Sequence, residues 1–228
     1  MASQSRTATK RAARAGAGDG GKRDLILAVA AERFAREGYE DTKWADIAAA
    51  VGVGTPGLYH YFESKEHCLF TIMEQVLADH CARFERIVGR GGDFPDTLVE
   101  VLYNLFDVSD RDVQRNRLLV AEQSLLHTPH PSPRGEAARQ AAQARSRDLE
   151  FLWGAFLARG MQQGVIADHP PRLLTRAVLG LVNGVWHWYR PHGARSREHV
   201  AEIYVRRTLA MLDLPPELAR ARSLRSLQ

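Results

Sequence analysis

The apolar residues of this chain recur at helical rather than strand spacing. Trp44, Ile47, Ala48 and Val51, for example, fall at positions i, i+3, i+4 and i+7, which form one face of an α-helix. No segment shows the strict apolar-polar alternation that is typical of a half-buried strand. The pattern therefore predicts an all-α fold.

Breaks rich in glycine, proline and histidine divide this pattern into about nine helices. The predicted helices cover residues 22–37, 43–51, 55–62, 65–89, 95–108, 111–127, 135–163, 171–190 and 196–213. Side-chain oxygens at two helix starts are suitable caps, so we expect Thr42 to cap the second helix and Ser64 the fourth.

Charge is distributed unevenly along the chain. The formal net charge is +4, and residues 1–23 hold six basic residues against one acidic residue. Residues 24–65 hold four basic against seven acidic residues, so net charge does not identify that segment as a nucleic-acid-binding one. We find neither an apolar run of membrane-spanning length nor a signal-peptide pattern, and we expect a cytoplasmic protein.

The first three predicted helices match a helix-turn-helix. A tight turn at residues 51–54 joins the second and third helices. Gly52 can adopt a positive φ there, Val53 can fill the seam between the helices, and Leu58 can seal the underside together with Ile47 and Ala48. The helix that starts near Thr55 is then held outward, as a DNA-reading helix is.

Residues 22–70 resemble the TetR family of transcriptional repressors. The shared positions, in the family's order and spacing, are Thr42, Ile47-Ala48, Val51-Gly52-Val53, Leu58-Tyr59, Tyr61-Phe62 and Lys65. The chain departs from the common pattern at residues 54–57, where Gly57 lacks a side chain with which to read a base. Pro56 is acceptable at a first helical turn, because its missing N–H would be unpaired there anyway.

The resemblance implies a set of DNA contacts. Residues 55–57 would approach base edges, the two tyrosines would contact the sugar-phosphate backbone, and the remaining members would contact phosphates. The set is Thr42, Lys43, Thr55, Pro56, Gly57, Tyr59, Tyr61 and Lys65. Arg11, Arg14 and Arg23 of the basic arm are candidates for an adjacent minor groove, as in homeodomain arms; a solvated tail is the alternative.

The helix predicted at 171–190 is apolar on more than one side, which indicates a second partner beyond its own core. Gly180 and Gly184 stand four residues apart and would let another helix approach closely. TetR-like proteins dimerise through their last two long helices. A two-fold dimer would present its reading helices roughly 34 to 36 Å apart and would select a palindromic operator.

The resemblance also implies an effector cavity in the middle and late helices. We expect Leu102, Phe106, Trp153, Phe156, Leu157 and Trp186 to form its walls, with Asn183 or His187 as polar anchors. Residues 182–191 resemble TetR-type regulators of fatty-acid and steroid breakdown, some of which respond to acyl-CoA thioesters. The effector would shift the dimer to wider spacing through the helix that begins at Lys65; alternatively, the aromatic residues simply fill the dimer core.

The expected organisation therefore has four parts. They are a disordered basic arm (1–21), a DNA-binding domain (22–64), a six-helix effector-binding and dimerisation domain (65–213) and a flexible tail (214–228). We predict no catalytic residues, no cofactor and no enzymatic activity, since no nucleophile or metal-hydrolase motif is found.

Two other readings remain as alternatives. A metal-responsive regulator could use His67, Cys68, His80, Cys81, His127 and His130, although none of these forms a tight C-x-x-C pair. The second alternative is a helical scaffold that does not bind DNA. Gly52, Gly54 and Gly57 also spell G-x-G-x-x-G, but the helical pattern before them argues against a dinucleotide site, which follows a strand.

Overall fold

The computed structural model of this chain describes residues 19–221, and every regular element among them is helical. The α-helices are α2 (Asp19–Glu37), α3 (Trp44–Ala50), α4 (Thr55–Tyr61), α5 (Lys65–Gly89), α6 (Phe94–Asn104), α7 (Asp110–Glu122), α8 (Pro133–Gln162), α9 (Pro171–Trp188) and α10 (Arg197–Met211). Two short 3₁₀ helices, η1 (Gln123–His127) and η2 (Pro216–Ala221), follow α7 and α10. The all-α prediction is confirmed.

Serine side chains start several of these helices. The hydroxyl of Ser64 accepts a hydrogen bond from the backbone N–H of His67, as the sequence predicts. Ser109, Ser132 and Ser196 cap α7, α8 and α10 in the same way. The prediction of a cap at Thr42 is wrong. Residue 43 precedes α3, and the Thr42 hydroxyl donates to the carbonyl of Gly38 at 2.7 Å instead.

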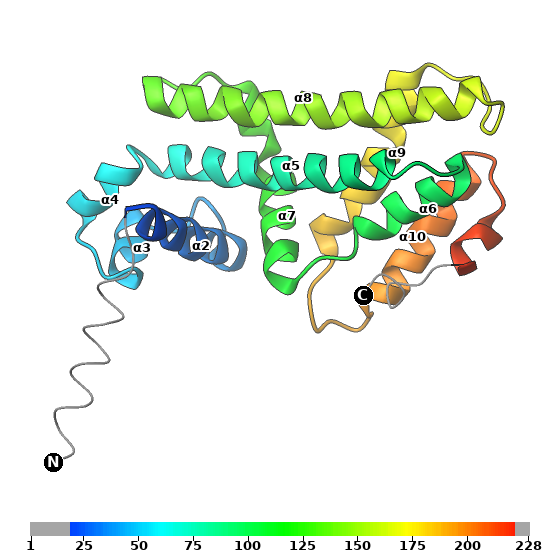
Figure 1. Cartoon of the computed structure of the whole chain (residues 1–228). Coiled ribbons are helices and arrows are strands. Elements are labelled where there is room, and N and C mark those ends of the chain that lie inside the picture. The colour runs from blue at the N-terminus through cyan, green and yellow to red at the C-terminus, as the bar shows by residue number, and fades with distance from the viewer. Residues whose placement is uncertain (1–18, 222–228) are drawn as a thin grey trace, which may run out of the picture.

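Figure 1 shows α2, α3 and α4 gathered at one end of the molecule. From there α5 runs along its length, α8 lies alongside α5, and α6, α9 and α10 gather toward the other end. Two hydrophobic clusters fill these two ends. One surrounds Ile47, Leu58 and Phe62, and the other contains Trp153 and Trp186.

The first cluster extends beyond the helix-turn-helix. It includes Leu69 and Met73 of α5, Leu118 of α7 and Ala142 of α8, all of them buried. The three N-terminal helices therefore share a continuous core with the rest of the chain across the boundary expected after residue 64. A movement of α5 or α8 would be transmitted directly to this core because packed interiors yield little.

Some helix ends differ from the predicted positions. The helix predicted at 111–127 ends at Glu122 and continues as η1, and the one predicted at 95–108 ends at Asn104. Helix α8 starts two residues early because the Ser132 cap and Pro133 favour a first turn there. Among the described residues, no helix combines the length and the hydrophobicity that spanning a membrane requires.

Ordered structure extends into both of the terminal segments that the sequence predicts to be unstructured. Helix α2 begins at Asp19, inside the expected arm of residues 1–21, while residues 1–18 lie outside the described part. Residues 214–221 are packed rather than frayed: Leu214 and Ala219 are buried, and the Tyr103 hydroxyl donates to the carbonyl of Ala219 at 2.8 Å. The expectation of a flexible tail is therefore wrong for 214–221, and residues 222–228 lie outside the described range.

Candidate nucleic-acid interface

The turn between α3 and α4 has the predicted geometry. Gly52 adopts a φ of +69°, which favours glycine, and the N–H of Val53 donates to the carbonyl of Ala48 at 3.0 Å. The ammonium group of Lys22 donates to the carbonyl of Val51 at 3.1 Å and so secures the C-terminal end of α3 from α2. The turn is held by a hydrogen bond within it and by Lys22 of α2, and these contacts fix the start of α4 relative to α3.

Helix α4 has a buried face and an exposed face. Leu58 is fully buried in the N-terminal cluster, whereas the next residue, Tyr59, is 50% exposed, and Pro56 and His60 are exposed as well. Thr55 and Gly57 are half-buried, and a Cβ added at Gly57 would lie 3.4 Å from that of Val53. The exposed face is rich in groups that can stack or donate hydrogen bonds, which suits a helix laid against a nucleic-acid groove.

Tyr61 lies at the end of α4, where a second helix approaches. Its ring packs edge-on against that of His60, with 5.2 Å between ring centroids. Its carbonyl accepts a hydrogen bond from Nη2 of Arg134 at 3.0 Å, and Arg134 belongs to the first turn of α8. The sequence patterns do not single out Arg134, because it lies 73 positions further along the chain.

Lys65 contacts the protein itself. Its Nζ atom donates to the carbonyls of Tyr39, Glu40 and Thr42 at 2.8, 3.2 and 3.2 Å, and it lies 4.4 Å from the centroid of the Tyr39 ring. Thr42 is 2% exposed. In this structure both side chains thus stabilise the α2–α3 turn, and neither presents its polar group to solvent where a phosphate would approach.

The other predicted DNA contacts, which are Lys43 for a phosphate and the arginines of the basic arm for the minor groove, are accessible to different degrees. Lys43 is exposed at the start of α3. Arg23 is half-buried on α2, with its guanidinium carbon 5.1 Å from the centroid of the Phe62 ring. Arg11 and Arg14 lie outside the described residues. The exposed predicted contacts are therefore Lys43, Pro56 and Tyr59, with Thr55, Gly57, Tyr61 and Arg23 partly accessible beside them.

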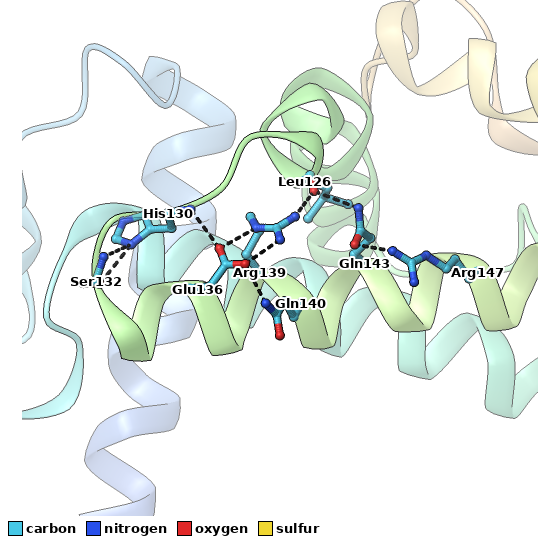
Figure 2. Close-up of polar contacts among 8 residues, drawn as sticks. All are labelled: Leu126, His130, Ser132, Glu136, Arg139, Gln140, Gln143 and Arg147. Atoms are coloured by element: carbon cyan, nitrogen blue, oxygen red, sulfur yellow. Dashed lines mark hydrogen bonds and ion pairs between the residues drawn. The ribbon is translucent and has the colours of Figure 1, made fainter.

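The loop before α8 is held by a network around Glu136 (Figure 2). The Glu136 carboxylate accepts hydrogen bonds from the backbone N–H of His130 at 2.8 Å and from Arg139 and Gln140 at 2.7 Å. Arg139 in turn donates to the carbonyl of Leu126. Hydrogen bonds from Arg139, followed by those from His130 and Gln140, hold the pKa of Glu136 well below its usual value. The start of α8 is thereby fixed relative to η1.

A second contact joins the start of α8 to the end of the helix-turn-helix. The carboxylate of Glu63, in the α4–α5 loop, accepts hydrogen bonds from the hydroxyl of Ser132 and the backbone N–H of Gly135. The bond from Ser132 is the main reason that the pKa of Glu63 lies below its usual value. The carboxylate thus meets the positive end of α8.

The predicted effector-binding walls come together, but the anchors do not. Leu102, Phe106, Trp153, Phe156, Leu157 and Trp186 are all buried in the second hydrophobic cluster. Within it, the rings of Phe94 and Phe156 stack with 4.7 Å between centroids, and Phe84 lies 5.1 Å from Trp153. Asn183 and His187 are exposed on α9 and do not enter this cluster. The sequence shows that α9 is apolar on several sides, but it does not show which side faces its own subunit.

Trp153 is the polar group that stands out in this cluster. The side chain is fully buried, and its indole Nε1–H has no hydrogen-bond acceptor among the described residues. A buried donor without a partner is unfavourable by about 1–3 kcal/mol, so such groups are rare in folded proteins. A ligand with a carbonyl oxygen could supply the acceptor.

Large apolar side chains are exposed on the last two α-helices. Leu173 and Trp188 of α9 are 66% and 48% exposed, and Ile203 of α10 is 44% exposed. A Cβ added at Gly180 or Gly184 would meet no atom within 4 Å. No helix of the same subunit occupies this face of α9 within the described residues. The face is therefore open to a second subunit.

The candidate metal ligands are dispersed. Among residues 19–221, no group of three or more His, Cys, Asp or Glu side chains is placed to hold a metal ion. Cys68 and Cys81 are both buried on α5 as free thiols. Nε2 of His80 donates to Oδ1 of Asn116 at 2.9 Å, and His67 packs edge-on against Phe62.

Comparison with known proteins gives matches to two family models. The model for bacterial regulatory proteins of the tetR family matches residues 26–72, and the model for the tetracyclin repressor-like C-terminal domain matches residues 120–212. Together they cover the helix-turn-helix and the whole region from η1 to α10.

Individual proteins match over most of their length. The HTH-type transcriptional repressor KstR2 of Rhodococcus jostii is 27% identical over 191 residues, which cover 82% of this chain and 89% of that one. The structure of the ketosteroid transcriptional regulator KstR2 of Mycobacterium tuberculosis has a TM-score of 0.70 at 24% identity and covers 87% and 97% of the two chains. That of AibR in complex with isovaleryl coenzyme A and operator DNA has a TM-score of 0.56 at 26% identity, with coverage of 81% and 96%.

Proposed function

Because the chain belongs to the TetR family of bacterial regulatory proteins, we propose that its exposed α4 surface reads an operator and that its C-terminal core binds a lipid-derived effector. The protein is a DNA-binding transcriptional regulator, and repression is the mode named for its KstR2 relatives. We place its action in the cytoplasm, where bacterial DNA lies, and assign it no catalytic step.

The presentation of α4 is the observation that carries the DNA-binding proposal. Leu58 anchors the helix from below, so Pro56 and Tyr59 stand on the opposite, exposed face. An α-helix presented in this way fits the major groove of B-DNA. Lys43 at the start of α3 would contact a phosphate on the flank. Thr42 and Lys65 act from within, by holding the turn that positions α3.

We assign the dimer interface to the open face of α9 together with α10. Leu173, Trp188 and Ile203 are large apolar side chains that a monomer would leave in water. The open space at Gly180 and Gly184 would let the two-fold-related α9 approach closely. Such a dimer presents two copies of α4 to a palindromic operator.

The effector proposal rests on the second hydrophobic cluster. Relatives of this chain include a ketosteroid transcriptional regulator, KstR2 of Mycobacterium tuberculosis, and AibR, whose structure is a complex with isovaleryl coenzyme A and operator DNA. An acyl-CoA thioester combines an apolar acyl group, which the aromatic walls could surround, with a carbonyl oxygen that could accept the bond from Trp153 Nε1. The core would have to open to admit it, because Trp153 and Leu157 are fully buried in the free protein.

A binding titration with DNA from the protein's own promoter region tests the proposal that α4 reads an operator. Wild-type protein should bind this duplex in preference to one of scrambled sequence. Tyr59→Phe removes only the hydroxyl and should weaken binding about tenfold or more, since a hydrogen bond to a charged phosphate contributes about 1.5–3 kcal/mol. Tyr59→Ala should weaken it further. If neither variant differs from wild type, α4 is not the reading helix.

The effector proposal can be tested with a series of acyl-CoA thioesters, from isovaleryl to steroid-derived acyl groups. Native mass spectrometry detects the bound thioester, and thermal-shift measurements report its effect on stability. The bound thioester should raise the melting temperature and lower operator affinity, because only differential binding can shift the population of DNA-competent dimers. Trp153→Phe keeps an aromatic ring but removes the donor, and it should bind the same thioester more weakly. Equal binding by this variant would exclude Trp153 as the anchor.

A further inference from the structure

The N-terminal end of α8 lies beside the end of the DNA-reading helix, as Figure 1 shows for α8 and α4. Arg134, in the first turn of α8, is exposed and donates from Nη2 to the carbonyl of Tyr61 at 3.0 Å. A guanidinium carries five N–H donors in a planar fork, and this bond uses one of them. Arg134 can therefore keep its contact with Tyr61 and still donate to a second acceptor.

Hydrogen bonds of the residues on both sides of Arg134 hold its backbone in place. Ser132 and Gly135, on either side of it in the sequence, both donate to Glu63 of the α4–α5 loop. The Glu136 network holds the preceding loop to η1 (Figure 2). A side chain on such a rigid support loses little further freedom when it binds, which favours its use in recognition.

The surroundings combine two cations with Tyr61, which the family resemblance assigns to the sugar-phosphate backbone. Arg23, Tyr61, His67 and Arg134 line one groove of about 370 Å³ between α2, α4, α5 and α8, with Glu74 further along it. Arg134 lies close to the α4–α5 junction, where it donates to Tyr61. Burial is the main reason that the pKa of the neighbouring His67 is lowered, and the charge of Arg134 lowers it further. The acidic neighbour Glu63 is already bound by Ser132 and Gly135.

We propose that Arg134 binds a backbone phosphate of the DNA next to the one that Tyr61 contacts, so that the C-terminal domain takes part in DNA binding through the first turn of α8. The inference rests on the proposed function, in which α4 reads the operator. Arginine suits this role because its fork binds phosphate oxygens with directed, charge-assisted hydrogen bonds. The contact adds affinity for any sequence and gives no base specificity.

A purely structural role for Arg134 predicts a different behaviour. A basic side chain that only caps the last carbonyls of α4 would stabilise the fold and would leave the salt dependence of DNA binding unchanged. A phosphate contact instead releases counterions, so its loss reduces the slope of log affinity against log salt concentration by about 0.9 for each contact. The slope therefore separates the two roles.

The experiment measures this slope for the full-length dimer on two duplexes, one selected by the wild-type protein and one of random sequence. Arg134→Gln keeps an N–H donor for Tyr61 but removes the charge, whereas Arg134→Lys keeps the charge. Arg147→Gln, on an exposed position of the same helix roughly 20 Å further along, is the matched control.

Arg134→Gln should reduce the slope by about 1.8 on both duplexes, since two subunits each lose one contact. Between about 50 and about 200 mM salt its affinity should then fall roughly 12-fold less than that of wild type. Arg134→Lys and Arg147→Gln should keep the wild-type slope. A wild-type slope for a folded Arg134→Gln dimer overturns the inference and leaves the proposed function intact; wild-type protein that binds neither duplex overturns both.

A second variant tests proximity without relying on charge. Arg134→Cys, labelled with an iron chelate that cleaves nearby DNA strands, should cut the backbone inside the bound site. The native thiols of Cys68 and Cys81 are buried, and burial raises the pKa of each, so they should stay unlabelled. Absence of cleavage in a complex that forms would contradict the proposed contact.

Discussion

Lys65 illustrates how a residue of the DNA-binding motif can act without facing the DNA. Its ammonium group donates to three backbone carbonyls of the α2–α3 turn. Removal of this group would leave these carbonyls without their charged partner. The bonds to Tyr39 and Thr42 are partly buried, so water would replace the ammonium group there only incompletely. The motif identifies the residue type from the sequence. The partners, at positions 39, 40 and 42, become evident only once the turn is folded.

We therefore predict that Lys65→Met lowers the free energy of unfolding by about 1–3 kcal/mol in the absence of DNA. Methionine retains most of the apolar stem, so the loss reports the ammonium group. Urea unfolding monitored by circular dichroism measures it. Lys43→Met is the matched control: Lys43 is exposed, and this variant should keep its stability within about 0.5 kcal/mol but bind DNA more weakly. Unchanged stability in Lys65→Met would contradict the assigned role.

His67 couples the stability of the same region to pH. The side chain is buried against Phe62, and Nδ1 lies 3.4 Å from the backbone N–H of Glu63. Burial lowers its pKa from the ordinary value of 6.5. Arg134, Arg23 and His130 act in the same direction, while Glu63 opposes them. The unfolded chain therefore binds a proton on this histidine more readily than the folded protein does.

The free energy of unfolding should accordingly decrease as the pH falls below about 6.5, which is the pKa of this histidine in the unfolded chain. The decrease should end once the pH is below its lower pKa in the folded protein. Measurement of unfolding free energies between about pH 5 and pH 8 should show that His67→Gln reduces this dependence. His80, whose pKa burial also lowers, should retain its own share. Exposed His169 provides the control substitution, His169→Gln. If wild type and His67→Gln lose stability in parallel, His67 does not contribute to the pH dependence.

At the scale of single elements, α9 has two apolar sides with different partners. Val178, Val182 and Val185 are buried in the subunit's own core, whereas Leu173 and Trp188 are exposed. Gly180 stands on the exposed side, where an added side chain meets nothing. A helix with this distribution completes its burial only when a second subunit covers the open side.

Gly180→Arg should therefore shift the protein from dimer to monomer, since a large charged side chain would prevent close approach of the two copies of α9. Sedimentation equilibrium measures the mass, and operator affinity should fall with it. Gly89→Arg is the control, because Gly89 ends α5 and likewise has open space around its Cβ. A Gly180→Arg protein that remains a dimer would place the interface elsewhere.

Helix positions are the part of the fold that the sequence predicts best. Apolar residues with a period of about 3.6 identify each helix, and breaks at glycine and proline separate the helices. The errors fall where a tertiary contact decides. Thr42 is bonded to Gly38 instead of capping α3, and residues 214–221 pack because Tyr103 binds Ala219. Local sequence contains no information on either partner.

The residues of the candidate site could likewise be predicted from the sequence only in part. The buried aromatic residues of the second hydrophobic cluster, such as Trp153 and Trp186, follow from helical periodicity. The anchors Asn183 and His187 do not, because they lie on the open side of α9, and a helix that is apolar nearly all round does not show which side faces inward. Arg134 also escapes prediction, since its contact with Tyr61 joins helices that are distant in the sequence.

At the scale of the whole molecule, α5 and α8 connect the two hydrophobic clusters. Helix α8 has 30 residues and extends about 45 Å. It runs from the contacts with Glu63 at its start to Trp153 and Phe156 in the second hydrophobic cluster. An effector that displaces Trp153 would therefore act on α4 through α8 as well as through α5. A coupling of about 1–3 kcal/mol through such rigid elements changes operator affinity by about 5- to 150-fold.

The central claim is that two copies of α4, presented on a two-fold dimer, read a palindromic operator. Selection of bound duplexes from a random library by the wild-type protein, followed by sequencing, tests it most directly. The enriched sequences should contain two inverted half-sites whose centres are separated by about one helical turn of DNA, or a multiple of it, and Tyr59→Ala should bind the enriched duplexes more weakly than wild type. A library that stays random, or an enriched motif without two-fold symmetry, would contradict the account.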